Sequence, residues 1–233
     1  MIDNHIPFIV ENKQIYLPFL GISLQESFSV ETEIGQFLLP SAQLLLLYYI
    51  YSKKDELAMS VLPEELQLSA MSVSRAVRQL EEAGLIRTHK NGVGKIISSE
   101  YCGEELYEKS AGLLRSPVKK RGYLDNATTN GSLKAGASAL AEYTMLNEPA
   151  LNTVALGKLP LGTAHLENRL SDADKQQCVE IWNYDPHILS KGTSVDPISL
   201  NLSLANCGDE RIQMESEKLM ERFWGDYHGK GAR

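Results

Sequence analysis

The chain has 233 residues, 43% of them hydrophobic and 23% charged, which is typical of a globular protein with a sizeable core. Its formal net charge of -7 is unevenly spread, with -4 in residues 1–39, +2 in residues 40–123 and -5 in residues 124–233. Three widely spaced cysteines without metal-ligand spacing argue against a disulfide framework and against structural zinc. With no apparent signal peptide and no apolar run long enough for a bilayer, we expect a cytoplasmic protein that does not contact a membrane.

The first residues predict a β-hairpin. Ile6–Val10 and Gln14–Leu20 are short apolar runs of β-forming residues on either side of a polar tripeptide. Gln25–Gly35 is polar and is interpreted as a connector. We therefore predict that residues 1–39 form an N-terminal β-hairpin extension.

A helix is predicted from Pro40 and Ser41 to about Ser52. Its centre, LLLLYYIY, is apolar on nearly every side, and a helix of that kind is buried. Two coverings remain open at this point, the N-terminal hairpin and a second subunit.

Residues 62–83 predict a short helix, a tight turn and a second helix. Val73, Val77 and Leu80 recur at helical spacing, Ser69 is a candidate N-cap, and Gly84 follows where a left-handed residue is expected. The outward face of the second helix would then carry Ala70, Met71, Ser74, Arg75 and Arg78. Small residues allow close approach to base edges, and arginines bind guanine or phosphate.

A second hairpin with a glycine-rich tip follows. Leu85–Thr88 and Lys95–Ser98 are the predicted strands around Asn91-Gly92-Val93-Gly94, and Lys90, Asn91 and Lys95 would approach phosphates. Two helices and then such a hairpin are the layout of a winged helix-turn-helix, which predicts binding of double-stranded DNA. The alternative is an ordinary amphipathic helix pair with solvated charges.

The next segment is predicted to be a helix at Gly103–Leu114 followed by a basic run. Lys119, Lys120 and Arg121 are candidate phosphate contacts, or else part of a solvated linker. Asp125–Ser132 is rich in turn-forming residues and marks the predicted domain boundary. The winged-helix domain is accordingly placed at residues 40–123 and an accessory domain at residues 131–233.

The accessory domain mixes element types. Strands are predicted at Asn152–Leu156 and Cys178–Trp182, and helices at Lys134–Asn147, Pro197–Leu204 and Asp209–Trp224. The fold class is therefore α+β, a winged helix-turn-helix domain followed by a smaller-sheet α+β domain. Its expected role is dimerisation, effector sensing or partner binding.

Signals for catalysis are sparse. The phosphate-loop, dinucleotide-binding, nucleophile-elbow and zinc-protease motifs are all absent from the sequence, so we predict no enzyme, no cofactor and no metal site. Trp182, Tyr184 and Asp185 lie close in sequence and, with Arg211, form a candidate ligand or partner site. Each also has an ordinary structural explanation as core residue, turn or surface charge.

The stretch LPEELQLSAMSVSRAVRQLEEAGLI resembles the helix-turn-helix of MarR-type winged-helix regulators. Segments along most of the chain, among them SAQLLLLYYIY, SPVKKRGYL, VEIWNYDP and DERIQMESEKLME, are similar to a bacterial family of MarR-like regulators. The resemblance implies groove contacts by Met71, Ser72, Ser74, Arg75 and Arg78, and a wing at Lys90–Lys95. It also implies a homodimer, although the acidic C-terminal half departs from the small all-helical MarR pattern.

The order of domains is also similar to that of AbiEi-type antitoxins, which repress their own operon beside a toxin gene. The leading hypothesis is a sequence-specific transcriptional regulator, specifically a repressor. The alternative is an antitoxin that binds its toxin through residues 124–233. A small effector or a cognate toxin would be the further partner in these two cases.

Overall fold

The computed structural model describes residues 8–10, 14–17, 22–25, 37–92, 94–129, 131–163 and 165–229. The chain divides into two compact units, Met1–Gln36 and Phe37–Arg233. In the first unit β1 (Phe8–Val10) pairs antiparallel with β2 (Gln14–Leu17), as the predicted hairpin requires. A third strand, β3 (Ile22–Gln25), pairs with β2 and was not predicted. The rest of the predicted connector lies outside the described residues.

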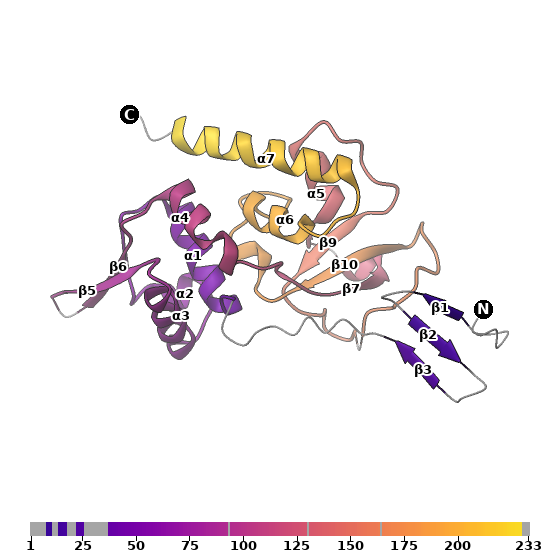
Figure 1. The fold of residues 1–233 in the computed structure, drawn as a ribbon, viewed down its shortest axis with the longest axis horizontal. Coiled ribbons are helices and arrows are strands. Elements are labelled where there is room, and N and C mark those ends of the chain that lie inside the picture. Colours follow the sequence, from indigo (N-terminus) through magenta and orange to yellow (C-terminus); the bar gives the residue numbers. More distant parts are fainter. Residues whose placement is uncertain are drawn as a thin grey trace. The chain divides into compact units, whose positions relative to one another are not determined.

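The second unit begins with three helices and a three-stranded sheet in the order of a winged helix (Figure 1). These elements are α1 (Pro40–Ser52), β4 (Glu56–Ala58), α2 (Leu62–Glu65), α3 (Ala70–Glu82), β5 (Arg87–Asn91) and β6 (Gly94–Ser98). The strand order is β4-β6-β5, and both pairings are antiparallel. Strand β4, three residues long, is the element that the sequence analysis missed here.

Local signals explain where α1 and α3 begin and end. Pro40 occupies the first turn of α1, where its missing N–H costs nothing, and Lys53 ends the helix in the left-handed conformation. The Ser69 hydroxyl accepts the N–H of Ser72 at 3.1 Å, so the predicted N-cap of α3 is confirmed. Gly84 has a φ of 69°, as predicted for the residue that follows this helix.

The remaining elements build a four-stranded sheet with helices beside it. They are α4 (Gly103–Ser110), β7 (Val118–Asp125), β8 (Leu133–Lys134), α5 (Gly136–Tyr143), β9 (Thr153–Leu156), β10 (Gln176–Trp182), α6 (Pro197–Leu204) and α7 (Glu210–Gly229). The strand order is β7-β10-β9-β8, with β10 antiparallel to β7 and parallel to β9. A mixed α+β fold with a winged helix before a sheet-containing region confirms the predicted fold class.

The structure changes the predicted domain limits in one respect. Residues 118–123, assigned from sequence to the winged-helix domain, belong to β7 and so to the four-stranded sheet. The predicted boundary falls on a 3₁₀ turn, Asn126–Thr129, in the connection from β7 to β8 of that same sheet. The division into a winged-helix and an accessory domain stays a prediction, because one compact unit contains both.

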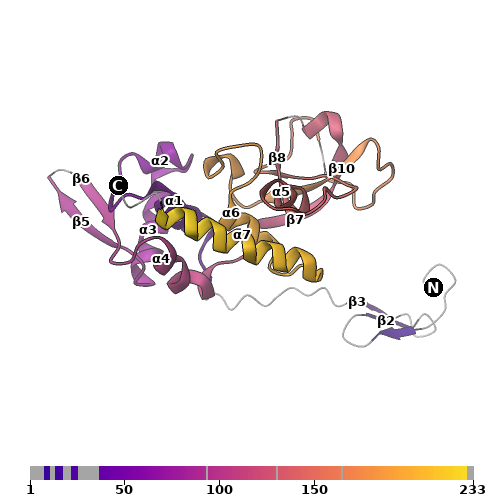
Figure 2. The ribbon, with the colours of Figure 1, turned by 90° about the horizontal axis from the view of Figure 1, so that it is seen from above.

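The main hydrophobic core of this unit spans the winged helix and the C-terminal helices. A second, smaller cluster at the four-stranded sheet is formed by Leu124, Val154, Leu166, Val179 and Ile181. Buried residues of α1 and α3 share one cluster with Trp182 and Tyr184 near the end of β10 and with Trp224 of α7. Figures 1 and 2 show the winged helix at one end of the unit, the four-stranded sheet at the other, and α7 extending along both. The apolar surface of α1 is thus covered within the same chain.

No helix in the described ranges is both long enough and apolar enough to cross a membrane.

Candidate nucleic-acid interface

The outward face of α3 is exposed as its periodicity predicts. Val73, Ala76, Val77 and Leu80 are buried against the core, which turns the opposite side of the helix to solvent. The predicted groove residues Ala70, Met71, Ser74, Arg75 and Arg78 are all exposed, and Ser72 is half-buried beside Ser69. Met71 is a large apolar side chain that is 67% exposed at the start of the helix.

The arginines of this face are available to a ligand. Arg78 approaches Glu82 at 3.8 Å, but the two side chains are 71% and 70% exposed. An exposed pair one helical turn apart contributes only about 0.3–0.5 kcal/mol, so phosphate or guanine competes with it easily. Arg75 is exposed one turn before Arg78 on the same helix face.

Two hydrogen bonds to the Glu81 carboxylate join the wing to the end of α3. Oε1 of Glu81 accepts the backbone N–H of Thr88 at 2.9 Å and the Thr88 hydroxyl at 2.6 Å. Thr88 lies in β5, so this contact joins α3 directly to the first strand of the wing. This contact fixes the spacing between the two surfaces that would face DNA.

The wing places two lysines opposite each other. In the register of β5 and β6, Lys90 pairs with Lys95 and Asn91 with Gly94, and both lysines are exposed. Like charges directly across a strand pair are destabilising by themselves and favour an anionic partner. Gly92 takes a φ of 60° at the tip, while the side chain of Asn91 and residue Val93 lie outside the described residues.

Only part of the basic run Lys119–Arg121, which lies in β7, is available to phosphate. This changes the prediction that all three residues are candidate phosphate contacts. Lys119 and Lys120 are exposed on β7, but Arg121 is committed to Glu180, its cross-strand partner on β10. Nη2 and Nε of Arg121 lie 2.6 and 2.9 Å from Oε1 of Glu180, whose side chain is fully buried. Because Nε and Nη2 are engaged by a buried carboxylate, Arg121 is less available to phosphate than Lys119 and Lys120.

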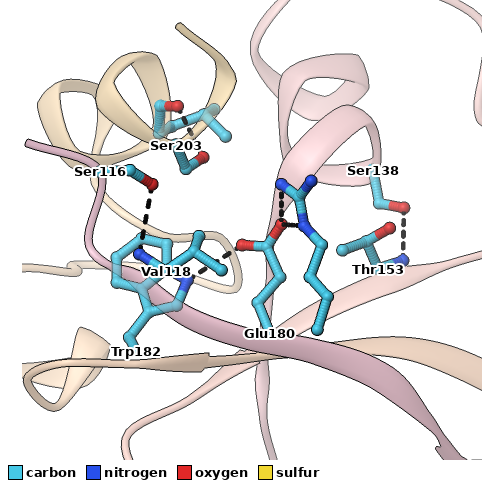
Figure 3. Close-up of polar contacts among 9 residues, drawn as sticks. Ser116, Val118, Ser138, Thr153, Glu180, Trp182 and Ser203 are labelled. Carbon is cyan, nitrogen blue, oxygen red and sulfur yellow. Dashed lines mark hydrogen bonds and ion pairs between the residues drawn. The ribbon is translucent and has the colours of Figure 1, made fainter. Parts of the chain in front are cut away.

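The candidate ligand site around Trp182 does not assemble as predicted. Trp182 is fully buried, its indole N–H donates to Glu180 at 3.0 Å (Figure 3), and its ring meets that of Tyr184 edge to face. Asp185 caps a short 3₁₀ turn by accepting the N–H of His187. Arg211 is exposed at the start of α7, and its backbone N–H donates to Oδ1 of Asp209 at 2.9 Å.

Two of those four residues do line a cavity that the sequence analysis did not identify. A space of about 880 Å³ is bounded by Tyr184 and Asp185 on one side and by the start of α1 and the α2–α3 turn on the other. These two walls are more than a hundred residues apart in the sequence, so no local sequence pattern could predict the cavity.

In the described residues no three potential metal-ligating side chains gather together. Asp172 and Asp174 lie two residues apart in a surface turn, where Asp172 accepts the N–H of Asp174 and pairs with Lys175 at 3.0 Å. The Lys175 ammonium is the main cause that lowers the pKa of the Asp172 carboxyl.

Comparison with protein families matches residues 39–95 to the MarR family. That range covers the whole of α1, α2 and α3 and extends into the wing. Comparisons with curated proteins and with solved structures found no match. The accessory part and the likeness to AbiEi-type antitoxins therefore stay predictions. Helix order, sheet topology and the family match agree that residues 39–95 form a MarR-like winged-helix domain.

Proposed function

We propose that this protein binds double-stranded DNA through α3 and the β5–β6 wing and acts as a transcriptional repressor. The observation that carries the proposal is the exposed pair Arg75 and Arg78 on a helix that the Glu81–Thr88 contact joins to a lysine-bearing wing. In this arrangement α3 enters the major groove and the wing follows the phosphate backbone. The MarR family match over the same residues supports it.

Charge sets the expected strength of non-specific binding. Residues 40–123 carry +2, whereas residues 124–233 carry -5, so the DNA-facing region is the positive part of an acidic protein. Few phosphate contacts imply weak sequence-independent affinity with a shallow salt dependence, because the slope of log K against log salt grows with the number of contacts. Specificity must then come from base contacts, for which the arginines and the small residues at the start of α3 are suited.

We propose in addition that the protein acts as a homodimer on a pseudo-palindromic site. Two-fold symmetric half-sites are the usual target of dimeric helix-turn-helix proteins, with half-sites about one helical turn apart. The dimer contact would use a surface other than α1, whose apolar residues are already buried in the chain's own core.

The experiment begins with selection of bound duplexes from a random-sequence pool, followed by gel-shift titration of the selected duplex at fixed salt. Arg75→Ala combined with Arg78→Ala is expected to abolish specific binding while the far-ultraviolet circular dichroism spectrum stays unchanged. The matched control is Arg169→Ala with Arg211→Ala, which removes the same charge from exposed positions outside the winged helix. Equal binding by the two double variants would overturn the groove assignment.

A further inference from the structure

A second cavity lies where α1, α5, α6 and α7 meet. It encloses about 480 Å³, within the range of small-molecule sites. Four aromatic rings contribute to its lining, those of Tyr51, Tyr143, Phe223 and Tyr227. Tyr51 and Phe223 pack edge to face with ring centroids 5.6 Å apart. Packed aromatic side chains therefore form this wall of the cavity.

One buried carboxylate in this lining is only half satisfied. Asp196 is 2% exposed, and its Oδ1 accepts the Tyr51 hydroxyl at 2.8 Å and the N–H of Ser199 at 2.9 Å. Its Oδ2 is also buried and has no hydrogen-bond partner among the described residues. A buried acceptor without a partner is costly, and native proteins rarely keep one without a purpose.

The surroundings show what kind of group is missing. Burial raises the pKa of Asp196, and burial together with the nearby Asp196 charge raises the pKa of Tyr143 to about 12. Burial and the same carboxylate raise the pKa of Tyr51. These groups therefore lack a positive partner, and another anion would be unfavourable here.

The lysines near the cavity do not supply that partner. Lys53 donates to the carbonyl of Tyr227 and lies 3.9 Å above the Tyr227 ring, while Lys191 is exposed. No ion pair joins either of them to Asp196 in the described part of the chain. Asp226, the other acidic residue of the lining, is exposed.

We propose that this cavity binds a small organic ammonium ion, attracted by the Asp196 carboxylate, with its apolar body among the aromatic rings. A charged donor satisfies the carboxylate, and the faces of Tyr and Phe attract cations. The site needs no contact with DNA and is independent of the proposed function. Tyr51 places it against the last turn of α1, the helix that packs on α3.

The test measures binding by isothermal titration calorimetry with three matched probes, tryptamine, tryptophol and indole-3-acetate, which are cationic, neutral and anionic. Tryptamine is expected to bind at least about tenfold more tightly than tryptophol, because hydrogen bonds to charged groups are the stronger class, and indole-3-acetate is expected not to bind. Indole-3-acetate binding as tightly as tryptamine, or no binding by tryptamine, would overturn the proposal.

Two variants distinguish a specific effect of the Asp196 carboxylate on tryptamine affinity from the effect of losing one negative charge anywhere on the protein. Asp196→Asn keeps an N-cap at α6 but removes the charge, and tryptamine affinity is expected to fall about tenfold or more. Asp174→Asn makes the same charge change at an exposed position outside the cavity lining and is expected to alter affinity less than threefold, about 0.6 kcal/mol at most. Unchanged affinity in Asp196→Asn contradicts the proposal.

If Asp196→Asn does not fold, the wild-type protein still decides. Tryptamine affinity is expected to rise with pH through the acidic range as Asp196 ionises, and a flat profile counts against the site. Burial keeps the pKa of Tyr51 and of Tyr143 above 10, outside that range. Lys53, Lys191 and Asp226 are the other charged groups of the lining, and repeating the profile in Asp226→Asn removes the second carboxylate.

Discussion

Replacing Arg121 with alanine should destabilise the fold strongly, even though the residue lies in what the sequence presents as a basic linker. The variant removes both guanidinium contacts, at 2.6 and 2.9 Å, from a Glu180 carboxylate whose side chain is fully buried. Breaking a buried ion pair by deleting one partner costs about 3–5 kcal/mol. Because the Arg121 side chain is 54% exposed and water can replace part of it, we expect the lower end, about 3 kcal/mol.

Urea denaturation followed by Trp fluorescence and circular dichroism measures this loss, provided that both probes report one transition. Lys120→Ala, an exposed neighbour on the same strand, is the control and should change the free energy of unfolding by less than about 0.5 kcal/mol. Adding Glu180→Gln to Arg121→Ala should restore part of the stability, because it removes the uncompensated charge. A loss in Arg121→Ala no larger than that of Lys120→Ala would refute the reasoning.

Three further outcomes follow from the geometry. Ser69→Ala removes the N-cap of α3 and should cost about 1 kcal/mol in the free energy of unfolding by urea titration, and no loss would contradict the capping role. Lys90→Ala should weaken DNA binding regardless of sequence and reduce the slope of log K against log salt by about one phosphate, and an unchanged slope would remove Lys90 from the interface. The folded-state pKa of Asp196 is raised by burial, so the folded protein holds this proton more tightly, and the resulting stabilisation declines as pH rises above the ordinary pKa of 3.8. The wild type should therefore lose stability relative to Asp196→Asn over that rise in chemical denaturation, and a constant difference would argue against it.

Elements with strong local signals could be predicted from the sequence closely. The predicted limits of α1 and α6 match those observed because a proline begins each of them and an apolar run fills it. Strand β7 was missed for the opposite reason: half of the residues in VKKRGYLD are charged, and its strand character depends on pairing with β10 more than fifty residues later. Gly122 shows the same dependence, since a Cβ there would lie 2.5 Å from Cβ of Leu166.

The candidate site likewise contains residues that local sequence patterns predict and residues whose roles depend on distant contacts. The exposed face of α3 follows from helical periodicity alone, so Arg75 and Arg78 could be identified without a structure. The role of Arg121 could not, because Glu180 is 59 residues away in the sequence and nothing local marks it as buried. The cavity at Asp196 could not be predicted for the same reason. The hydrogen-bond partner of Asp196, Tyr51, is 145 residues away, and Asp196-Pro197 has the sequence of an ordinary helix start.

Helix α1 explains why these distant parts behave as one unit. Its apolar residues suggested either a hairpin cover or a second subunit, yet one side packs on α3 and the other contacts the C-terminal helices. The Tyr51 hydroxyl donates to Asp196, and the Tyr227 hydroxyl donates to the Ile50 carbonyl at 3.1 Å. A helix shared by two halves of a core cannot shift on one side without strain on the other. Packing of α1 therefore joins the winged helix to the C-terminal helices within one buried cluster.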